Sequence, residues 1–185
     1  MANQLARKPY PWDVTDAQWE ILAPVIPEPG AYSPRGPIPR REIVNGILYL
    51  LRTGCSWRPM PHDVPNGQTV YDYVRKWKLD GTWEKAMTVL RKDVRTQAGR
   101  DPEPSAAIID SQSIKTSPVR GSERGFDGGK HISGRKRYLL VDTLGLLLAI
   151  TVHSAGLVDR RGAPLLLQEL GGRFPRLSHL FADSG

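Results

Sequence analysis

Residues 106–114 read AAIIDSQSI, a short apolar run that is typical of a buried β-strand and whose hydrophobic part ends at Asp110. Two runs of the same kind follow, RYLLVD at 137–142 and LLLAITVH at 146–153. Residues 142–145 lie between these two runs, with aspartate first and glycine last, as in a type I turn. We therefore expect the second and third strands to form a hairpin.

The remainder of this half predicts one helix and one more strand. The helix is expected over about residues 162–170, with Pro164 in its first turn, because proline is not tolerated further inside a helix. LSHLFADSG, at 177–185, is typical of a strand that ends at Asp183. Residues 106–185 therefore predict a domain of mixed α and β structure.

The residues before 106 predict helices separated by proline and glycine. Helices are expected after Thr15 or Asp16 and over residues 40–52, 69–79 and 83–95. In the third of these, apolar residues recur at the spacing of one buried helix face, namely at Val70, Tyr73, Val74 and Trp77. The polar, proline-containing segment QAGRDPEPS then indicates a domain boundary. We expect an α+β protein with a helical domain at 1–98, a linker at 99–105 and a second domain at 106–185.

The chain is basic, with 26 Lys and Arg against 19 Asp and Glu, a formal net charge of +7 and a pI near 9.8. Such an excess favours a polyanionic partner. It is concentrated in residues 115–137, where seven basic residues stand against Glu123 and Asp127. The single cysteine, Cys55, excludes an intrachain disulfide, and no apolar run is long enough to cross a bilayer. We expect a cytoplasmic protein without a membrane partner.

Two aspartates follow apolar strands directly. Asp110 and Asp183 each stand at the carboxyl end of such a run and are followed by serine. Carboxylates held in this way on adjacent strands can share hard divalent cations such as Mg²⁺. Two such ions can activate a water or a 3′-hydroxyl for phosphodiester chemistry. Aspartates at strand ends are also common turn formers and helix caps, so position alone leaves both interpretations open.

The helices over 40–52 and 69–79 could form a helix-turn-helix-like unit. In that interpretation one helix face meets the DNA bases and nearby arginines contact phosphates. The face would present Gln68, Tyr71, Arg75 and Lys78, and the arginines would be Arg40, Arg41 and Arg58. The connecting loop is longer than the usual tight turn, and a solvated helix face explains the same pattern equally well.

A glycine-rich basic stretch follows Asp110. Its members Lys115, Lys130, Arg135, Lys136 and Arg137 are close in sequence to the first acid. We expect them to form a flexible loop that holds a DNA strand beside the acid. A disordered surface loop is the alternative.

Five segments together resemble the IS5-family insertion-sequence transposases, which belong to the IS4/IS5-like group of the DDE superfamily. In chain order they are WDVTDAQWEIL (12–22), RTGCSWRPMP (52–61), IIDSQSIKT (108–116), GFDGGKHISGRKRYLLVDTLGLLLA (125–149) and FADSG (181–185). The resemblance implies an RNase H-like catalytic domain with an Asp-Asp-Glu triad and two Mg²⁺ ions. By position, Asp110 matches the first acid and Asp183 the second.

The resemblance also implies a function. Such enzymes bind double-stranded DNA at the inverted repeats of a transposon, cleave it and transfer it to target DNA, in the bacterial cytoplasm and at the nucleoid, in some cases as homo-oligomers. The glutamate that completes the triad has no counterpart up to Gly185, and Glu169 comes before Asp183 in the chain. We therefore expect a truncated transposase with an incomplete catalytic domain. The alternative is an inactive DNA-binding fragment that represses transposition.

Overall fold

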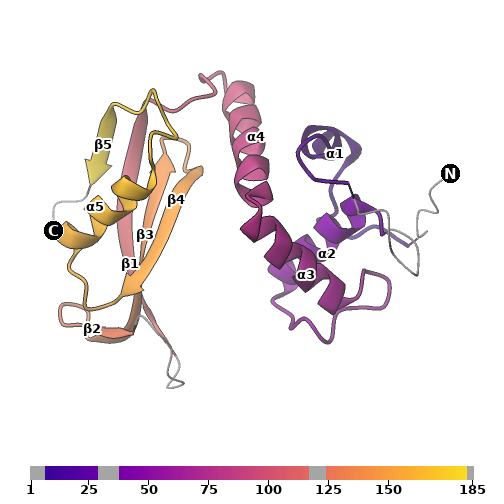
Figure 1. Ribbon diagram of the computed structural model, residues 1–185, viewed down its shortest axis with the longest axis horizontal. Coiled ribbons are helices and arrows are strands. Elements are labelled where there is room, and N and C mark those ends of the chain that lie inside the picture. The colour runs from indigo at the N-terminus through magenta and orange to yellow at the C-terminus, as the bar shows by residue number, and fades with distance from the viewer. Residues whose placement is uncertain (1–6, 29–37, 117–123, 183–185) are drawn as a thin grey trace. The chain divides into compact units, whose positions relative to one another are not determined.

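The computed structural model describes residues 7–28, 38–116 and 124–182 (Figure 1). The chain divides into two compact units, Met1–Asp93 and Val94–Gly185. The segment 99–105, expected to be a linker, packs within the second unit. There Arg95 Nε donates to the carbonyl oxygen of Asp101 at 2.8 Å, and Pro104 is fully buried.

The first unit consists of helices whose ends follow from local chemistry. They are α1 (Asp16–Leu22), α2 (Arg40–Thr53), α3 (Gly67–Leu79) and α4 (Thr82–Gln97), the last of which continues into the second unit. Thr15 and Gln18 form a capping box at the start of α1, and the Asn66 side chain caps α3. Gly54 ends α2 in the left-handed conformation, with φ 66°. The four predicted helices are therefore confirmed.

Helices α2 and α3 lie at the centre of the first unit's core, to which α1, the α2–α3 loop and α4 also contribute buried side chains. Ile43 on α2 and Val70 and Trp77 on α3 are fully buried. The two helices approach closely at Gly46, where a Cβ atom would lie 3.1 Å from Val70 Cγ2. The predicted buried face of α3 is thus confirmed, and it leaves the opposite face of this helix to solvent.

The second unit is a five-stranded sheet with one helix. Its elements are β1 (Ala106–Lys115), β2 (Gly125–Asp127), β3 (Ile132–Asp142), β4 (Leu147–Ser154), α5 (Asp159–Glu169) and β5 (His179–Ala182). Strand β1 is antiparallel to β3 and parallel to β5, and β3 also pairs antiparallel with β4 and with the short β2. The predicted β3–β4 hairpin is confirmed, with Gly145 N donating to Asp142 O at 2.9 Å.

Three features differ from the sequence-based prediction. Strand β1 does not stop at Asp110, because pairing with β3 continues as far as Lys115 opposite Gly134. Helix α5 begins at Asp159, so Pro164 lies past the first turn and one backbone hydrogen bond is lost there. The described part of the basic stretch that was predicted as a flexible loop is mostly β-structure, because β2 pairs with the start of β3, and β3 pairs in turn with β1.

Helix α5 covers one face of the sheet, and the other face is open (Figure 1). On the covered face Tyr138, Leu140 and Leu166 are almost completely buried. On the open face Ile108, Ile150 and Phe181 are exposed. Across the described residues, no helix combines the length and apolar character needed to span a membrane.

Candidate active site and DNA-binding surface

Asp110 lies in the middle of β1 and on the open face of the sheet. Side chains alternate along a strand, and the buried neighbours Ala107 and Ile109 point to the α5 side, so Asp110 points away from it. Its side chain is exposed, and its Oδ1 accepts a hydrogen bond from Ser111 N at 2.7 Å. Within the described parts of the chain, Oδ2 has no hydrogen-bond partner. One carboxylate oxygen is therefore available to a ligand.

The register of β1 and β5 brings the neighbourhood of the second acid to this point. In this parallel pair Ile108 is opposite Phe181 and Ile109 is opposite Ala182. Asp110 and Asp183 are the residues that follow Ile109 and Ala182. Asp183 itself lies outside the described residues.

The donor chemistry at Asp110 fits a hard divalent cation, since a free carboxylate oxygen is the ligand that Mg²⁺ prefers. No group of three or more His, Cys, Asp or Glu side chains suited to a metal ion occurs within residues 7–28, 38–116 and 124–182. Asp110 is thus the described half of the pair that the sequence predicts.

Cross-strand pairing arranges the open face around Asp110 in rows. Asp110 is opposite Leu139, which in turn is opposite Ile150 of β4. The next row holds Gln112, Arg137 and Val152. The row beyond it holds Ile114, Arg135 and Ser154. Two of the predicted DNA-binding arginines therefore share the sheet face of Asp110.

Arg137 is held by a neutral partner. Its Nε donates to Gln112 Oε1 at 2.9 Å, and its Nη2 donates to the same oxygen. Gln112 was not among the predicted site residues. Strand periodicity alone could have found it, since it lies two residues beyond Asp110 on the same face.

The other two members of the predicted basic loop lie at the ends of strands. Lys115 is the last residue of β1 and is exposed. Lys130 is exposed in the turn between β2 and β3, where its backbone N–H donates to Asp127 Oδ1 at 3.1 Å. Both ammonium groups can therefore reach a phosphate.

Lys136 requires a correction. It points to the α5 side of the sheet and is buried, with its Nζ 3.4 Å from Asp127 Oδ2 and 3.2 Å from Asp159 Oδ1. The reason is the alternation of β3, in which Lys136 shares a face with the buried Tyr138. Its charge is used inside the unit, so Lys136 is not part of the DNA-binding surface that we propose below.

Asp127 is the centre of this internal cluster. Its carboxylate accepts hydrogen bonds from Ser113 Oγ and from the backbone N–H groups of Gly129 and Lys130. The hydrogen bond from Ser113, followed by that from Lys130 and the charge of Lys136, lowers the pKa of Asp127 to about 2. The cluster joins the β2–β3 hairpin to β1, and it was not predicted from the sequence.

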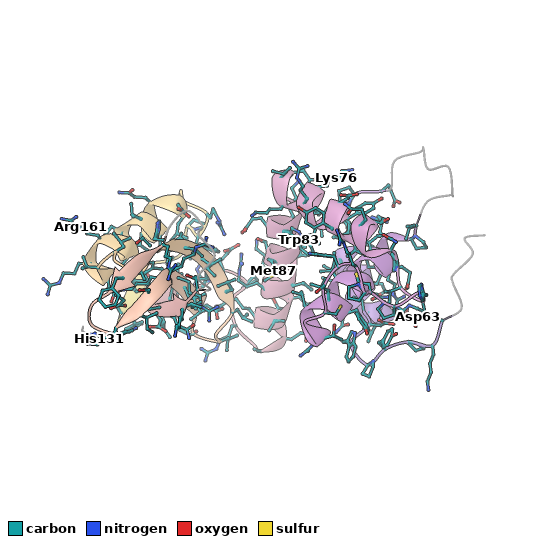
Figure 2. All side chains as sticks on the ribbon, turned by 90° about the horizontal axis from the view of Figure 1, so that it is seen from below. Asp63, Lys76, Trp83, Met87, His131 and Arg161 are labelled. Carbon is teal, nitrogen blue, oxygen red and sulfur yellow. The ribbon has the colours of Figure 1, made fainter. Side chains whose placement is uncertain are left out.

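In the first unit, the predicted recognition face of α3 is exposed. Gln68, Tyr71, Arg75 and Lys78 all lie on it. The Gln68 side chain donates from Nε2 to Asp72 Oδ1 at 3.0 Å, and the ring of Tyr71 meets that of Trp57 edge-on, with centroids 5.4 Å apart. Arg58 is exposed in the preceding loop. Lys76, which the sequence reasoning did not select, is also exposed on α3 (Figure 2).

Arg40 and Arg41, which were predicted to contact phosphates, are both engaged within the unit. Arg40 donates from Nη1 to the carbonyl oxygen of Ala23 at 3.1 Å and forms an ion pair with Glu28. Arg41 donates from Nε to the carbonyl oxygen of Val14 at 3.1 Å and forms an ion pair with Asp16. These contacts fasten α1 and the segments beside it to α2.

Comparison with protein families identifies both units. Residues 14–87 match a model described as "Putative transposase of IS4/5 family", and residues 101–185 match one described as "Transposase DDE domain". The first unit is thus similar to IS4/5-family transposases, and the second to the DDE domain of transposases. Its mixed α/β second unit is consistent with a DDE domain of the RNase H-like fold.

A curated relative supports the assignment. The insertion element IS402 uncharacterized 16.2 kDa protein of Burkholderia cepacia is 29% identical over 108 residues, which are 55% of this chain and 72% of the relative. No solved structure matched the chain.

Proposed function

We propose that this transposase chain binds the ends of an insertion sequence through α3 and acts on DNA phosphodiester bonds at Asp110 and Asp183 with Mg²⁺. The observation that carries the proposal is the β1–β5 register, in which Ile109 and Ala182, the residues before the two acids, are partners. A parallel register of this kind favours two neighbouring carboxylates at one sheet position. Bound divalent ions would supply an activated nucleophile and neutralise charge on the leaving oxygen.

The DNA contacts are divided between the two units. On α3, Gln68 and Tyr71 are suited to base edges, and Arg75 and Lys78 to phosphates. Arg58 in the loop before this helix adds a phosphate contact. In the second unit, the phosphate contacts come from Lys115, Lys130, Arg135 and Arg137. The helix-turn-helix-like role of α2 and α3 is part of this proposal, as is association of more than one copy on DNA.

A second candidate function is binding of transposon ends without strand transfer. The observation that favours it is the exposed face of α3, whose Arg75 and Lys78 can contact DNA independently of Asp110. Incubation of this chain with duplex DNA and Mg²⁺ separates the two functions, because transfer products appear only if the site is complete.

DNA binding by α3 is tested with the double variant Arg75→Ala and Lys78→Ala. Affinity for a labelled duplex is measured by fluorescence anisotropy at several salt concentrations. Loss of two phosphate contacts lowers the slope of log K against log salt by about 2. The control is Arg160→Ala with Arg161→Ala, which removes the same charge from exposed positions on α5 (Figure 2). Equal slopes for both double variants would refute the role of α3.

The metal site is tested with Mn²⁺, followed by electron paramagnetic resonance on the DNA-bound protein. Asp110→Asn and Asp183→Asn should each reduce the bound Mn²⁺, since each removes a charged ligand. Glu169→Gln removes an exposed carboxylate of α5 and should leave the bound Mn²⁺ unchanged. Unchanged binding in both aspartate variants would exclude the proposed site.

A further inference from the structure

We propose that Arg137 binds the reacting phosphate at the Asp110 site and that Gln112 is a positioning residue for it. This inference rests on the proposed function, because it assumes that Asp110 holds a metal ion beside DNA. It assigns a task to one arginine among several basic residues, and it adds Gln112 to the site.

Arg137 lies close enough to Asp110 to reach a ligand bound there. Asp110 is paired with Leu139, and Arg137 is two residues away from Leu139 on β3. Asp110 and Arg137 are therefore diagonal neighbours on one sheet face, with Cα atoms about 7–8 Å apart. An arginine side chain spans such a distance readily. A phosphate held beside Asp110 would therefore lie within reach of the Arg137 guanidinium.

Hydrogen bonds to Gln112 fix the orientation of the Arg137 guanidinium. Two N–H groups of Arg137, on Nε and Nη2, donate to the single oxygen Gln112 Oε1. This contact fixes one edge of the planar guanidinium against β1. Within the part of the chain that the structure describes, the donors on Nη1 have no partner, and a planar fork held in this way suits an oxyanion.

The positive charge of Arg137 differs from that of the neighbouring cations in its partner. Lys136 is paired with the carboxylates of Asp127 and Asp159, and Arg95 with that of Asp142. Arg137 has no carboxylate partner among residues 7–28, 38–116 and 124–182, and the amide of Gln112 orients it without neutralising it. A cation that the protein holds in place and leaves uncompensated is suited to bind an anion from outside.

The residues beside Arg137 on the open sheet face leave it free to bind an anion. On its β4 side Arg137 is opposite Val152, which is 49% exposed and apolar. The valine offers no competing hydrogen bond and excludes water from one side of the arginine stem. The described acid nearest along the face is Asp110, whose charge a bound metal ion would offset. The row of Gln112, Arg137 and Val152 thus forms a phosphate seat beside the acid.

The experiment compares four variants of the whole chain with wild type, using a fluorescein-labelled duplex DNA in Ca²⁺ buffer. Binding is measured by anisotropy over a range of salt concentrations. Arg137→Ala should lower the salt slope by about 1, the value for one lost phosphate contact. Gln112→Glu should lower the salt slope by a similar amount, because the new carboxylate keeps the contact with Arg137 but neutralises the guanidinium charge. Thermal unfolding should show that Gln112→Glu is as stable as wild type.

Two controls match these changes in charge. Arg161→Ala removes a positive charge, and Gln168→Glu adds a negative one, both at exposed positions on α5. Both should leave the slope unchanged. A purely structural role for the Gln112–Arg137 contact would leave DNA binding by Gln112→Glu equal to that by Gln168→Glu, and that result would overturn the inference. The same holds if Arg137→Ala behaves like Arg161→Ala.

Different results would refute the proposed function and the role of Arg137. If the wild-type chain binds no duplex, or if Asp110→Asn and Asp183→Asn keep their bound Mn²⁺, the site itself is refuted. Suppose instead that the wild-type chain binds duplex DNA and that the two aspartate variants bind less Mn²⁺, while Arg137→Ala has the same salt slope as Arg161→Ala. The site at Asp110 and Asp183 is then supported, and only the role of Arg137 is refuted.

Discussion

Gly162 of α5 lies directly against the ring of Tyr138 on β3, so that a Cβ atom at position 162 would come within 2.0 Å of Tyr138 Cζ. The helix can approach the sheet this closely because residue 162 has no side chain. Tyr138 Oη donates to the carbonyl oxygen of Leu157 at 3.2 Å. Burial, reinforced by the Asp159 carboxylate, raises the pKa of Tyr138 to about 12, so the phenol keeps its proton.

The first prediction concerns this contact. Gly162→Ala should lower the free energy of unfolding by about 1–3 kcal/mol, because the added methyl group overfills a packed site. Chemical denaturation measures the loss. Gly128→Ala is the control, since a Cβ atom there would have no neighbour within 4 Å. Similar losses for the two variants would contradict the packing argument.

The second prediction concerns the ion pair between Arg95 and Asp142. The Arg95 Nη1 and Asp142 Oδ2 atoms are 2.5 Å apart, and the side chain of Asp142 has no exposed surface. Arg95→Ala should destabilise the protein by about 3–5 kcal/mol, because it leaves a buried carboxylate without its partner. Arg176→Ala, which breaks the half-exposed pair with Asp101, should cost less than about 1 kcal/mol. Thermal unfolding of both variants compares the two costs, and equal values would refute the prediction.

The third prediction is a pH dependence. Hydrogen bonds lower the pKa of Asp127 from 3.8 to about 2, so the unfolded chain takes up the proton first as pH falls. The stabilisation is therefore complete above pH 3.8 and is lost as pH falls toward 2. Asp127→Asn should remove this part of the acid transition, followed by circular dichroism. Ser113→Ala removes the largest cause of the shift and should remove part of it, and an unaltered transition in both variants would disprove the assignment.

The fourth prediction separates structure from DNA binding at Lys136. Lys136→Met should lower the free energy of unfolding, because Asp127 and Asp159 both lose their cation. The salt slope of DNA binding, measured on the folded variant, should stay at the wild-type value. A slope lowered by about 1 would instead return Lys136 to the DNA-binding surface.

The sequence predicted most elements of both units because their signals are local. The caps at Thr15 and Asn66 and the turn at Gly145 are each set by one or two side chains. The C-terminal end of β1 and the existence of β2 were missed, because both depend on pairing with the distant β3. The start of α5 at Asp159 was missed because proline at position 164 argued for a later start, whereas packing of Gly162 on Tyr138 favours the longer helix.

The site was predicted in part. Strand character around Asp110 followed from its apolar neighbours, but the flanking partners Gln112 and Arg137 required the register of β1 with β3. Lys136 was placed with the DNA contacts because it is basic and lies in the stretch that follows Asp110. In a strand, Lys136 lies on the same face as Tyr138 and Leu140, which are two and four residues further on and are buried. This spacing places Lys136 on the inner face of the sheet.

The central position of Asp110 in β1 makes its backbone slow to open and ordered before a ligand binds. Its backbone lies within a strand that pairs with β3 from Ala107 through Lys115 and with β5 up to Ile109. Such a segment opens only when the unit around it opens, so amide hydrogen exchange there should be slow. The carboxylate is thus carried on backbone that is already ordered before any ion or DNA arrives. Little conformational entropy remains to be lost at that backbone on binding.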